Sequence, residues 1–131
     1  MFIAIPVSTG ELVDKITILE IKSQNIRAKT KLRNINSELN ILNLQLKKLL
    51  RHSPKAPKIM QLKRKLQKIN IRLWKVEDEI RRYEERKKFG NHFIQLARNI
   101  YKLNDERFTI KQKINVLHDS YIQEEKQYTD K

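Results

Sequence analysis

Cysteine is absent from the 131 residues, and Gly and Pro occur only two and three times. The lack of cysteine excludes a disulfide framework, a thiolate nucleophile and a Cys-based metal site. So few Gly and Pro residues leave little room for a turn-rich β-sheet protein and favour an all-α fold. The three histidines show no metal-ligand spacing, and no Gly-rich phosphate loop occurs. We therefore expect neither a metal nor a cofactor.

Long apolar runs are also missing from the sequence. No stretch approaches the length that spans a bilayer. Residues 1–7 are apolar, but this run is too short for the core of a signal peptide, and no basic residue precedes it. We therefore expect a cytoplasmic protein.

Acidic residues are absent from residues 39–76, although this stretch contains eleven Lys and Arg. The whole chain has a formal net charge of +14 and a pI near 10.1. A field of this sign attracts nucleic acid, anionic membrane surfaces or acidic proteins. The alternative is coding bias, because abundant Ile, Lys and Asn are typical of an AT-rich genome.

A first helix is predicted from about residue 9 to residue 51. Ser8 and Glu11 have the spacing of a capping box, and Val7 and Leu12 are placed as a hydrophobic staple. The apolar period slips once, between residues 26 and 32. Two prolines in the segment HSPKAP end the helix, because proline blocks its continuation.

Two further helices are predicted, at about 57–89 and 91–124. Between them lies Gly90, which we expect to cap the C-terminus of the second helix. Apolar residues of the second helix alternate at spacings of three and four, which is typical of coiled-coil packing. The stripe of the third helix has the same character but includes Arg107.

Short connections make consecutive helices antiparallel neighbours. The predicted fold is therefore one domain over residues 1–131, an elongated antiparallel three-helix bundle with coiled-coil-like packing and a short extended N-terminal segment. The tip between the first two helices is basic. The opposite end is expected to gather the start of the first helix and the turn at Gly90.

Some apolar residues lie off these stripes, namely Val13, Ile18, Ile21, Ile71 and Trp74. Apolar side chains on more than one face of a helix indicate a further contact surface. We expect residues 2–7 to cover part of it and a second copy, in a homodimer, to cover the rest.

Arg107 in an apolar stripe requires an acidic partner, because an unpaired buried guanidinium is very costly. The predicted register offers Glu20, Glu77 or Asp78. The polar cluster expected around Arg107 consists of Glu11, Asp14, Lys15, Glu20, Lys22, Trp74, Glu77, Asp78, Arg81, Arg98, Asn104, Asp105 and Arg107, with Arg82 beside it. One interpretation is an ion-pair network that fixes helix register. The other is a binding pocket for an anion or metal between helices.

The basic tip is the second candidate site. Its members are Lys47, Lys48, Arg51, Lys55, Lys58, Lys63, Arg64, Lys65 and Lys68. Nucleic-acid-binding proteins have such patches. No aromatic residue lies between Phe2 and Trp74, so stacking on unpaired bases is not expected here. The alternative is an ordinary solvated charged face.

Three stretches carry a resemblance to a known family. They are IPVS at 5–8 with GELVDKITILEIK at 10–22, LW with ED and IR between 73 and 81, and FIQLARNIYKLNDER with its continuation between 93 and 115. On these segments the chain resembles an uncharacterised family of short bacterial helical proteins, a domain of unknown function. The resemblance covers most of the chain except the basic tip and implies no activity.

Three functions fit these observations. The first is a non-catalytic helical protein–protein interaction or scaffold module. The second is a small enzyme with a carboxylate and arginine site between helices, acting on an anionic substrate. The third is binding of nucleic acid or another polyanion through the basic hairpin. We place the first ahead of the others and leave open whether the protein is an enzyme.

Overall fold

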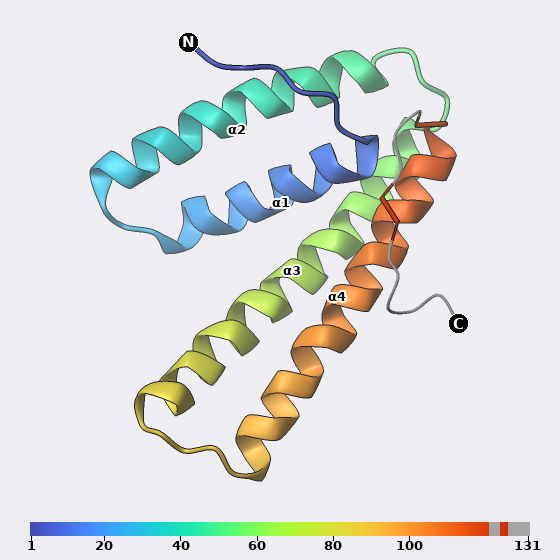
Figure 1. Cartoon of the computed structure of the whole chain (residues 1–131). Helices are drawn as coiled ribbons and strands as arrows, with labels where there is room; N and C mark the ends of the chain where they lie inside the picture. The colour runs from blue at the N-terminus through green and yellow to red at the C-terminus, as the bar shows by residue number, and fades with distance from the viewer. Residues whose placement is uncertain (121–123, 126–131) are drawn as a thin grey trace.

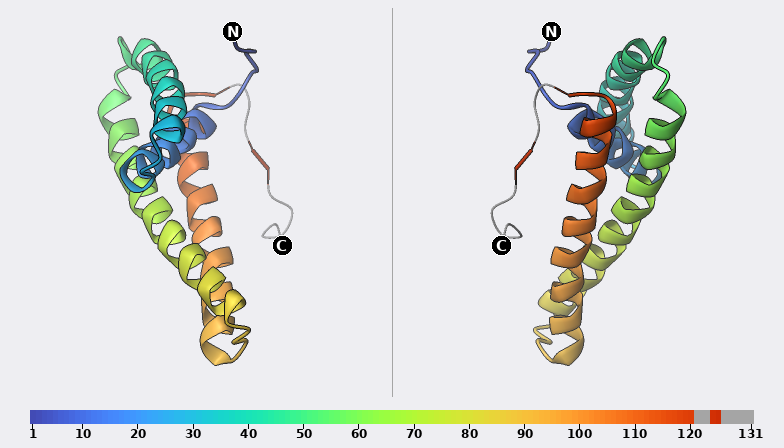
Figure 2. Two further views of the ribbon diagram at one scale, coloured as in Figure 1. Left: turned by 90° about the vertical axis from the view of Figure 1, so that its left-hand side faces the viewer. Right: turned by 90° about the vertical axis from the view of Figure 1, so that its right-hand side faces the viewer.

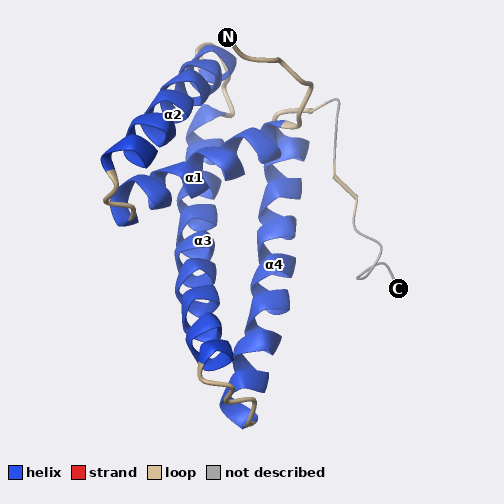
Figure 3. Cartoon of the chain, turned by 60° about the vertical axis from the view of Figure 1, so that its left-hand side comes forward, coloured by secondary structure: helices blue, strands red, loops and turns tan. Residues whose placement is uncertain are grey.

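Helices make up most of the described residues. The computed structural model describes residues 1–120 and 124–125. Its four helices are α1 (Thr9–Asn25), α2 (Lys29–Leu50), α3 (Ala56–Glu85) and α4 (Asn91–Leu117) (Figure 1). The described residues contain no strand (Figure 3). The prediction of an all-α fold is therefore confirmed.

The helices form a long antiparallel pair with a shorter pair folded across one end. α3 and α4 run side by side along their length, and α1 crosses their upper half (Figures 1 and 2). α2 runs back along α1. α1 is the central element, since it contacts each of the other three helices. The lower part of the α3–α4 pair projects beyond α1, and we call it the α3–α4 arm.

The predicted first helix is in fact two helices. Ile26 and Ala28 adopt extended backbone conformations, and the Asn25 side chain donates to the carbonyl of Ile21 at 2.7 Å. No Gly or Pro causes this break. Folding α2 back covers apolar side chains of α1, and this burial outweighs the hydrogen bonds lost between the two helices. The slip in the apolar period between residues 26 and 32 marks the place.

The break also reverses the expected direction of α1. The start of α1 lies at the end of the molecule that carries the α2–α3 turn, where it meets the C-terminal end of α4 (Figure 1). The prediction that it meets the turn at Gly90 is wrong. That turn lies at the far end of the α3–α4 arm.

The core lies where α1 crosses α3 and α4. Its members are Leu12, Val13, Ile16, Leu46, Ile59, Leu66, Ile69, Leu73, Leu103, Ile110 and Ile114. Val13 and Ile21, which were assigned to a partner surface, are buried within the chain instead. They are covered because α1 is surrounded by three helices rather than two. The apolar stripes predicted for α3 and α4 do supply most of this core.

The turn between α3 and α4 does not depend on glycine. Lys87 has a φ of 54°, and its N–H and that of Lys88 donate to the carbonyls of Glu84 and Tyr83. This double hydrogen bond is a Schellman motif, which ends α3 before Gly90. Gly90 is extended and precedes α4. α4 closes in the same way near Asp119, so its predicted end at about 124 is too late, and residues 121–123 lie outside the described residues.

The N-terminal segment, residues 2–7, is extended and does not cover α1 as expected. Phe2, Ile3 and Ile5 are 72%, 88% and 71% exposed. Val7 is also exposed, and its staple with Leu12 stays a prediction. The segment leaves the body of the molecule at the end that carries the α2–α3 turn (Figures 1 and 2).

Candidate functional site

Asp14 is the centre of a polar network that joins three helices. Its side chain is 1% exposed and accepts hydrogen bonds from both Nε (2.9 Å) and Nη2 of Arg107. Asn70 of α3 donates to Asp14 Oδ1 at 2.9 Å and to Thr17 Oγ1 at 2.8 Å. Arg107 therefore points inward as predicted. Its acidic partner is Asp14, however, and the prediction of Glu20, Glu77 or Asp78 is wrong.

Lys111 extends this network by one turn of α4. Its Nζ lies 2.7 Å from Glu11 Oε2, 3.0 Å from Glu124 Oε2 and 4.0 Å from Asp14 Oδ2. Burial lowers the pKa of Lys111, but its hydrogen bonds to Glu11 and Glu124 outweigh burial and leave the pKa raised. The hydrogen bond to Asp14 raises the pKa of Arg107 in the same way. Both groups are therefore cationic at neutral pH.

The C-terminal end of α4 caps the N-terminus of α1. Ser8 Oγ accepts from the N–H of Glu11, as the capping box predicted. The N–H of Gly10 donates to Asn115 Oδ1 at 2.6 Å, and Thr9 Oγ1 lies 2.8 Å from His118 Nδ1. The bonds from the N–H groups of Gly10 and Glu11 satisfy backbone donors that a helix start leaves unpaired. The bonds to Asn115 and His118 fix where α1 sits on α4.

Gly10 permits this close approach. A Cβ atom at this position would clash with the backbone carbonyl of Lys111 and lie 2.9 Å from Asn115 Oδ1. The backbone of α4 cannot move aside as a flexible side chain would. Gly90 has no atom within 4 Å of the corresponding point.

Gly10→Ala is therefore expected to destabilise the protein by about 1–3 kcal/mol, the usual cost of overpacking. Gly90→Ala serves as the matched control and should be neutral or slightly stabilising, because Gly90 is extended with free space around it. Urea unfolding followed by circular dichroism measures both. Equal midpoints would show that the contact between α1 and α4 is not as close as described.

The remaining members of the predicted cluster are dispersed. Lys15 pairs with Glu38 of α2 at the surface, and Glu20 pairs with Lys63 of α3, both at 3.0 Å. Asn104 accepts from Arg107 Nη1 at 3.4 Å, which is a long contact. The two ion pairs join α1 to α2 and α1 to α3.

Some of the other predicted members line a hollow beside Arg107, and the rest lie on the α3–α4 arm or elsewhere on α4. Lys22, Trp74, Glu77 and Arg107 line one small hollow of about 170 Å³ with Ile18, Ile21, Asn70 and Leu73. Asp105 is half-buried on α4. Arg81 and Arg98 are exposed on the α3–α4 arm. The prediction that Arg81, Arg82 and Arg98 share one cluster with Glu11 and Asp14 is wrong, because the reversed α1 places Glu11 and Asp14 at the other end of the molecule.

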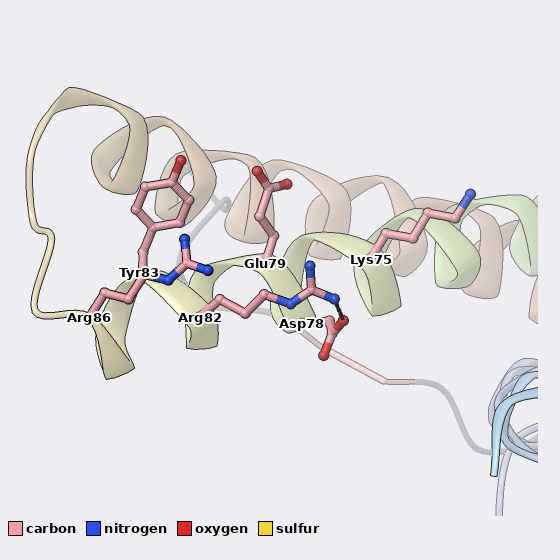
Figure 4. Close-up of a pocket in the computed structure, with 6 residues that line it drawn as sticks. All are labelled: Lys75, Asp78, Glu79, Arg82, Tyr83 and Arg86. Atoms are coloured by element: carbon pink, nitrogen blue, oxygen red, sulfur yellow. Dashed lines mark hydrogen bonds and ion pairs between the residues drawn. The ribbon is translucent and has the colours of Figure 1, made fainter. Parts of the chain in front are cut away.

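A further hollow of about 400 Å³ lies along the exposed side of α3 on the arm (Figure 4). Arg82 Nη2 lies 2.8 Å from Asp78 Oδ2 there, and His92 Nε2 lies 2.9 Å from Glu79 Oε1. Acidic and basic side chains are mixed along this part of the helix, and both ion pairs are exposed. This arrangement is that of a solvated, mixed-charge helix face.

The polar network has the properties of an ion-pair network that stabilises the fold. Both oxygens of Asp14 accept hydrogen bonds, and Glu11 and Glu20 are each paired with a lysine. No group of three His, Asp or Glu side chains within residues 1–120 and 124–125 has the geometry to hold a metal ion. The carboxylates of Asp14, Glu11 and Glu20 are therefore occupied by internal partners.

The basic hairpin is the part of α2 and α3 that flanks their turn. Among its predicted members only Lys63 is partly buried, where it meets Glu20. The side chains of Lys47, Lys48, Arg51, Lys55, Lys58, Arg64, Lys65 and Lys68 are all exposed. The structure therefore gathers these charges at one end of the molecule (Figure 1).

Two hollows at this end are lined in part by basic side chains. One, of about 380 Å³, lies between α2 and α3 and includes Lys47, Arg51 and Lys63. The other, of about 600 Å³, lies between α3 and α4 and is lined by Lys58, Gln61, Leu62, Lys65, Thr109, Gln112, Lys113, Val116 and Leu117. Neither lining includes a carboxylate, so the positive surface continues onto α4.

A family model matches residues 3–131 of this chain. The chain belongs to the DUF6165 family. DUF6165 is a family of unknown function, as the resemblance in the sequence indicated. Comparison with curated proteins and with solved structures gives no match. No helix in the described part of this DUF6165 protein is long and apolar enough to cross a membrane.

Sequence reasoning missed five residues of the polar network in this DUF6165 protein, namely Thr17, Asn70, Lys111, Asn115 and Glu124. A signal for three of them is present. Arg107, Lys111 and Asn115 recur every four residues, so they share one face of α4. Thr17 likewise follows Asp14 by three residues. Asn70 lies beside the apolar stripe of α3, where nothing in the sequence distinguishes it from a surface residue.

Proposed function

We propose that this protein is a non-catalytic binding protein that holds a polyanion on its basic hairpin. One observation carries this proposal: the exposed Lys and Arg of the hairpin come from a stretch of 38 residues, 39–76, that has no acid. Two other long stretches lack acids, residues 21–37 and 86–104, but each is shorter and contains only five Lys and Arg. A one-sign surface attracts an oppositely charged partner over a Debye length, whereas a mixed surface does not.

The shape of this end supports contact with more than one anionic group. The hollows that contain Lys47 and Arg51 on one side, and Lys58, Lys65 and Lys113 on the other, lie on different sides of α3. A linear polyanion can therefore meet basic side chains from α2, α3 and α4. Lysine binds phosphate or sulfate as a point charge, and the hairpin has no aromatic side chain on which bases would stack.

The other two candidate functions gain less from the structure. A carboxylate and arginine enzyme site would have to use Glu77 in the small hollow of about 170 Å³ beside Arg107, because Asp14, Glu11 and Glu20 are engaged within the chain. A protein-interaction module was inferred partly from Val13 and Ile21, which the chain itself buries. Homodimer formation and a cytoplasmic location stay predictions.

The hairpin is tested with Lys58→Gln/Arg64→Gln/Lys65→Gln, which spares Lys63 and its pair with Glu20. The probes are heparin and a short DNA duplex, with affinity measured over a range of salt concentrations. The parent is expected to bind more weakly as salt increases, because binding releases counterions. Loss of three phosphate contacts should reduce the slope of log K against log salt by about 2.7.

The matched control is Arg81→Gln/Arg98→Gln/Lys102→Gln. These residues are exposed on the α3–α4 arm, and the change removes the same three charges. It should weaken binding much less than the hairpin change does. Equal loss in both variants would mean that net charge alone drives binding. Absence of binding by the parent at low salt would contradict the proposed function.

A further inference from the structure

The N-terminal segment and the basic hairpin reach the same end of the molecule. Figures 1, 2 and 3 all show them at the end opposite the α3–α4 turn. A flat surface laid across this end would meet both. The two features differ in chemistry, since one is apolar and the other cationic.

The segment is unusual because its apolar side chains have no cover. Phe2, Ile3, Ile5 and Val7 are all exposed, and Met1 precedes them. Residues 1–7 contain no charged or polar side chain. A contiguous run of exposed large apolar residues marks a site of interaction. The positive surface described above lies at the same end of the molecule and attracts an anionic partner.

An anionic lipid surface satisfies both features at once. Its headgroups attract lysine and arginine, and its acyl boundary accepts apolar side chains. One weak apolar anchor gives only marginal binding, but an apolar anchor together with a polybasic patch gives stable binding. Each Lys or Arg near such a surface raises partitioning about fivefold. No described helix crosses a membrane, so the protein would lie on the surface.

We infer that the protein binds the surface of an anionic membrane, with the side chains of Phe2, Ile3 and Ile5 inserted and the basic hairpin against the headgroups. This inference rests on the proposed function and names its partner. Duplex nucleic acid offers the same phosphate charge but no place for the apolar segment. A second copy of the chain would cover the segment but would bring two positive surfaces together.

The test uses the full chain and flotation with vesicles of phosphatidylcholine alone or with about one-third phosphatidylglycerol. The parent is expected to float only with the anionic vesicles, and less so at high salt. Phe2→Ser/Ile3→Ser/Ile5→Ser should reduce binding to anionic vesicles at least about tenfold while heparin binding is retained. The segment lies outside every helix, so circular dichroism should be unchanged.

Two further variants complete the experiment. Lys58→Gln/Arg64→Gln/Lys65→Gln should lose binding to both vesicles and heparin. Phe89→Ser/Ile94→Ser removes exposed apolar side chains at the opposite end, on either side of the α3–α4 turn. It is the matched control and should bind vesicles like the parent.

Several outcomes would overturn the inference. Unchanged vesicle binding by the Phe2, Ile3 and Ile5 variant would show that the segment takes no part. Binding of the parent to DNA or heparin but not to vesicles would leave the proposed function standing and assign a nucleic acid as partner. A dimeric parent that becomes monomeric on the serine changes, measured by light scattering, would assign the segment to a second copy. Failure with every probe would remove the proposed function as well.

Discussion

Leu66→Asp is expected to destabilise the protein by about 4 kcal/mol or more, the largest effect of any change considered. Leu66 has 0% exposure and belongs to the core at which α1 meets α3 and α4. The substitution removes apolar contacts and places a carboxylate where the surrounding side chains are apolar. A chain of this size has a total stability of roughly 5–15 kcal/mol, so much of the protein should unfold at moderate temperature.

Leu44→Asp is the matched control. Leu44 is 59% exposed on α2, so the same substitution should change stability by no more than about 0.5 kcal/mol. Urea unfolding by circular dichroism gives the free energy of each variant. Similar losses at the two positions would contradict the described packing of α3 against α1.

The apolar stripes of α3 and α4 were predictable because their spacing alternates three and four without a fault. Leu66, Ile69 and Leu73 on α3 are buried as the period requires. The division of the first predicted helix was not recognised. No glycine or proline punctuates residues 26–28, and only the slip of the apolar period indicated it. The helix breaks there because α2 packs on α1. Helix propensities of the individual residues do not indicate such a break.

The two candidate sites also differ in how far the sequence could predict them. The basic hairpin was predictable because its residues are close in sequence on either side of a proline-marked turn. The partner of Arg107 depends on the direction of α1, which the missed break reverses. Its inward orientation followed from its own stripe, whereas its pairing with Asp14 required the tertiary arrangement. Ion pairs between distant helices are therefore the first detail to be lost when one helix boundary is misplaced.

The ion pair between Asp14 and Arg107 provides the second large effect. Arg107→Met leaves the buried carboxylate of Asp14 without its main partner. Lys111 is 4.0 Å away and already serves Glu11 and Glu124. Removal of one member of a buried ion pair costs about 3–5 kcal/mol. Arg98→Met, on the exposed arm, is the control for the loss of an arginine and should be nearly neutral.

The double variant Asp14→Asn/Arg107→Met separates the charge from the packing. Asparagine keeps an oxygen that can accept from Asn70, so the carboxylate charge is removed while that contact is preserved. Its stability should recover most of the loss, because a neutral pair does not require buried charge compensation. Thermal and urea unfolding of the two single variants and the double variant give the coupling energy. If Arg107→Met alone is as stable as the parent, the network does not hold α1 on α4. If the double variant is no more stable than Arg107→Met, the shape of the guanidinium rather than its charge is what the core requires.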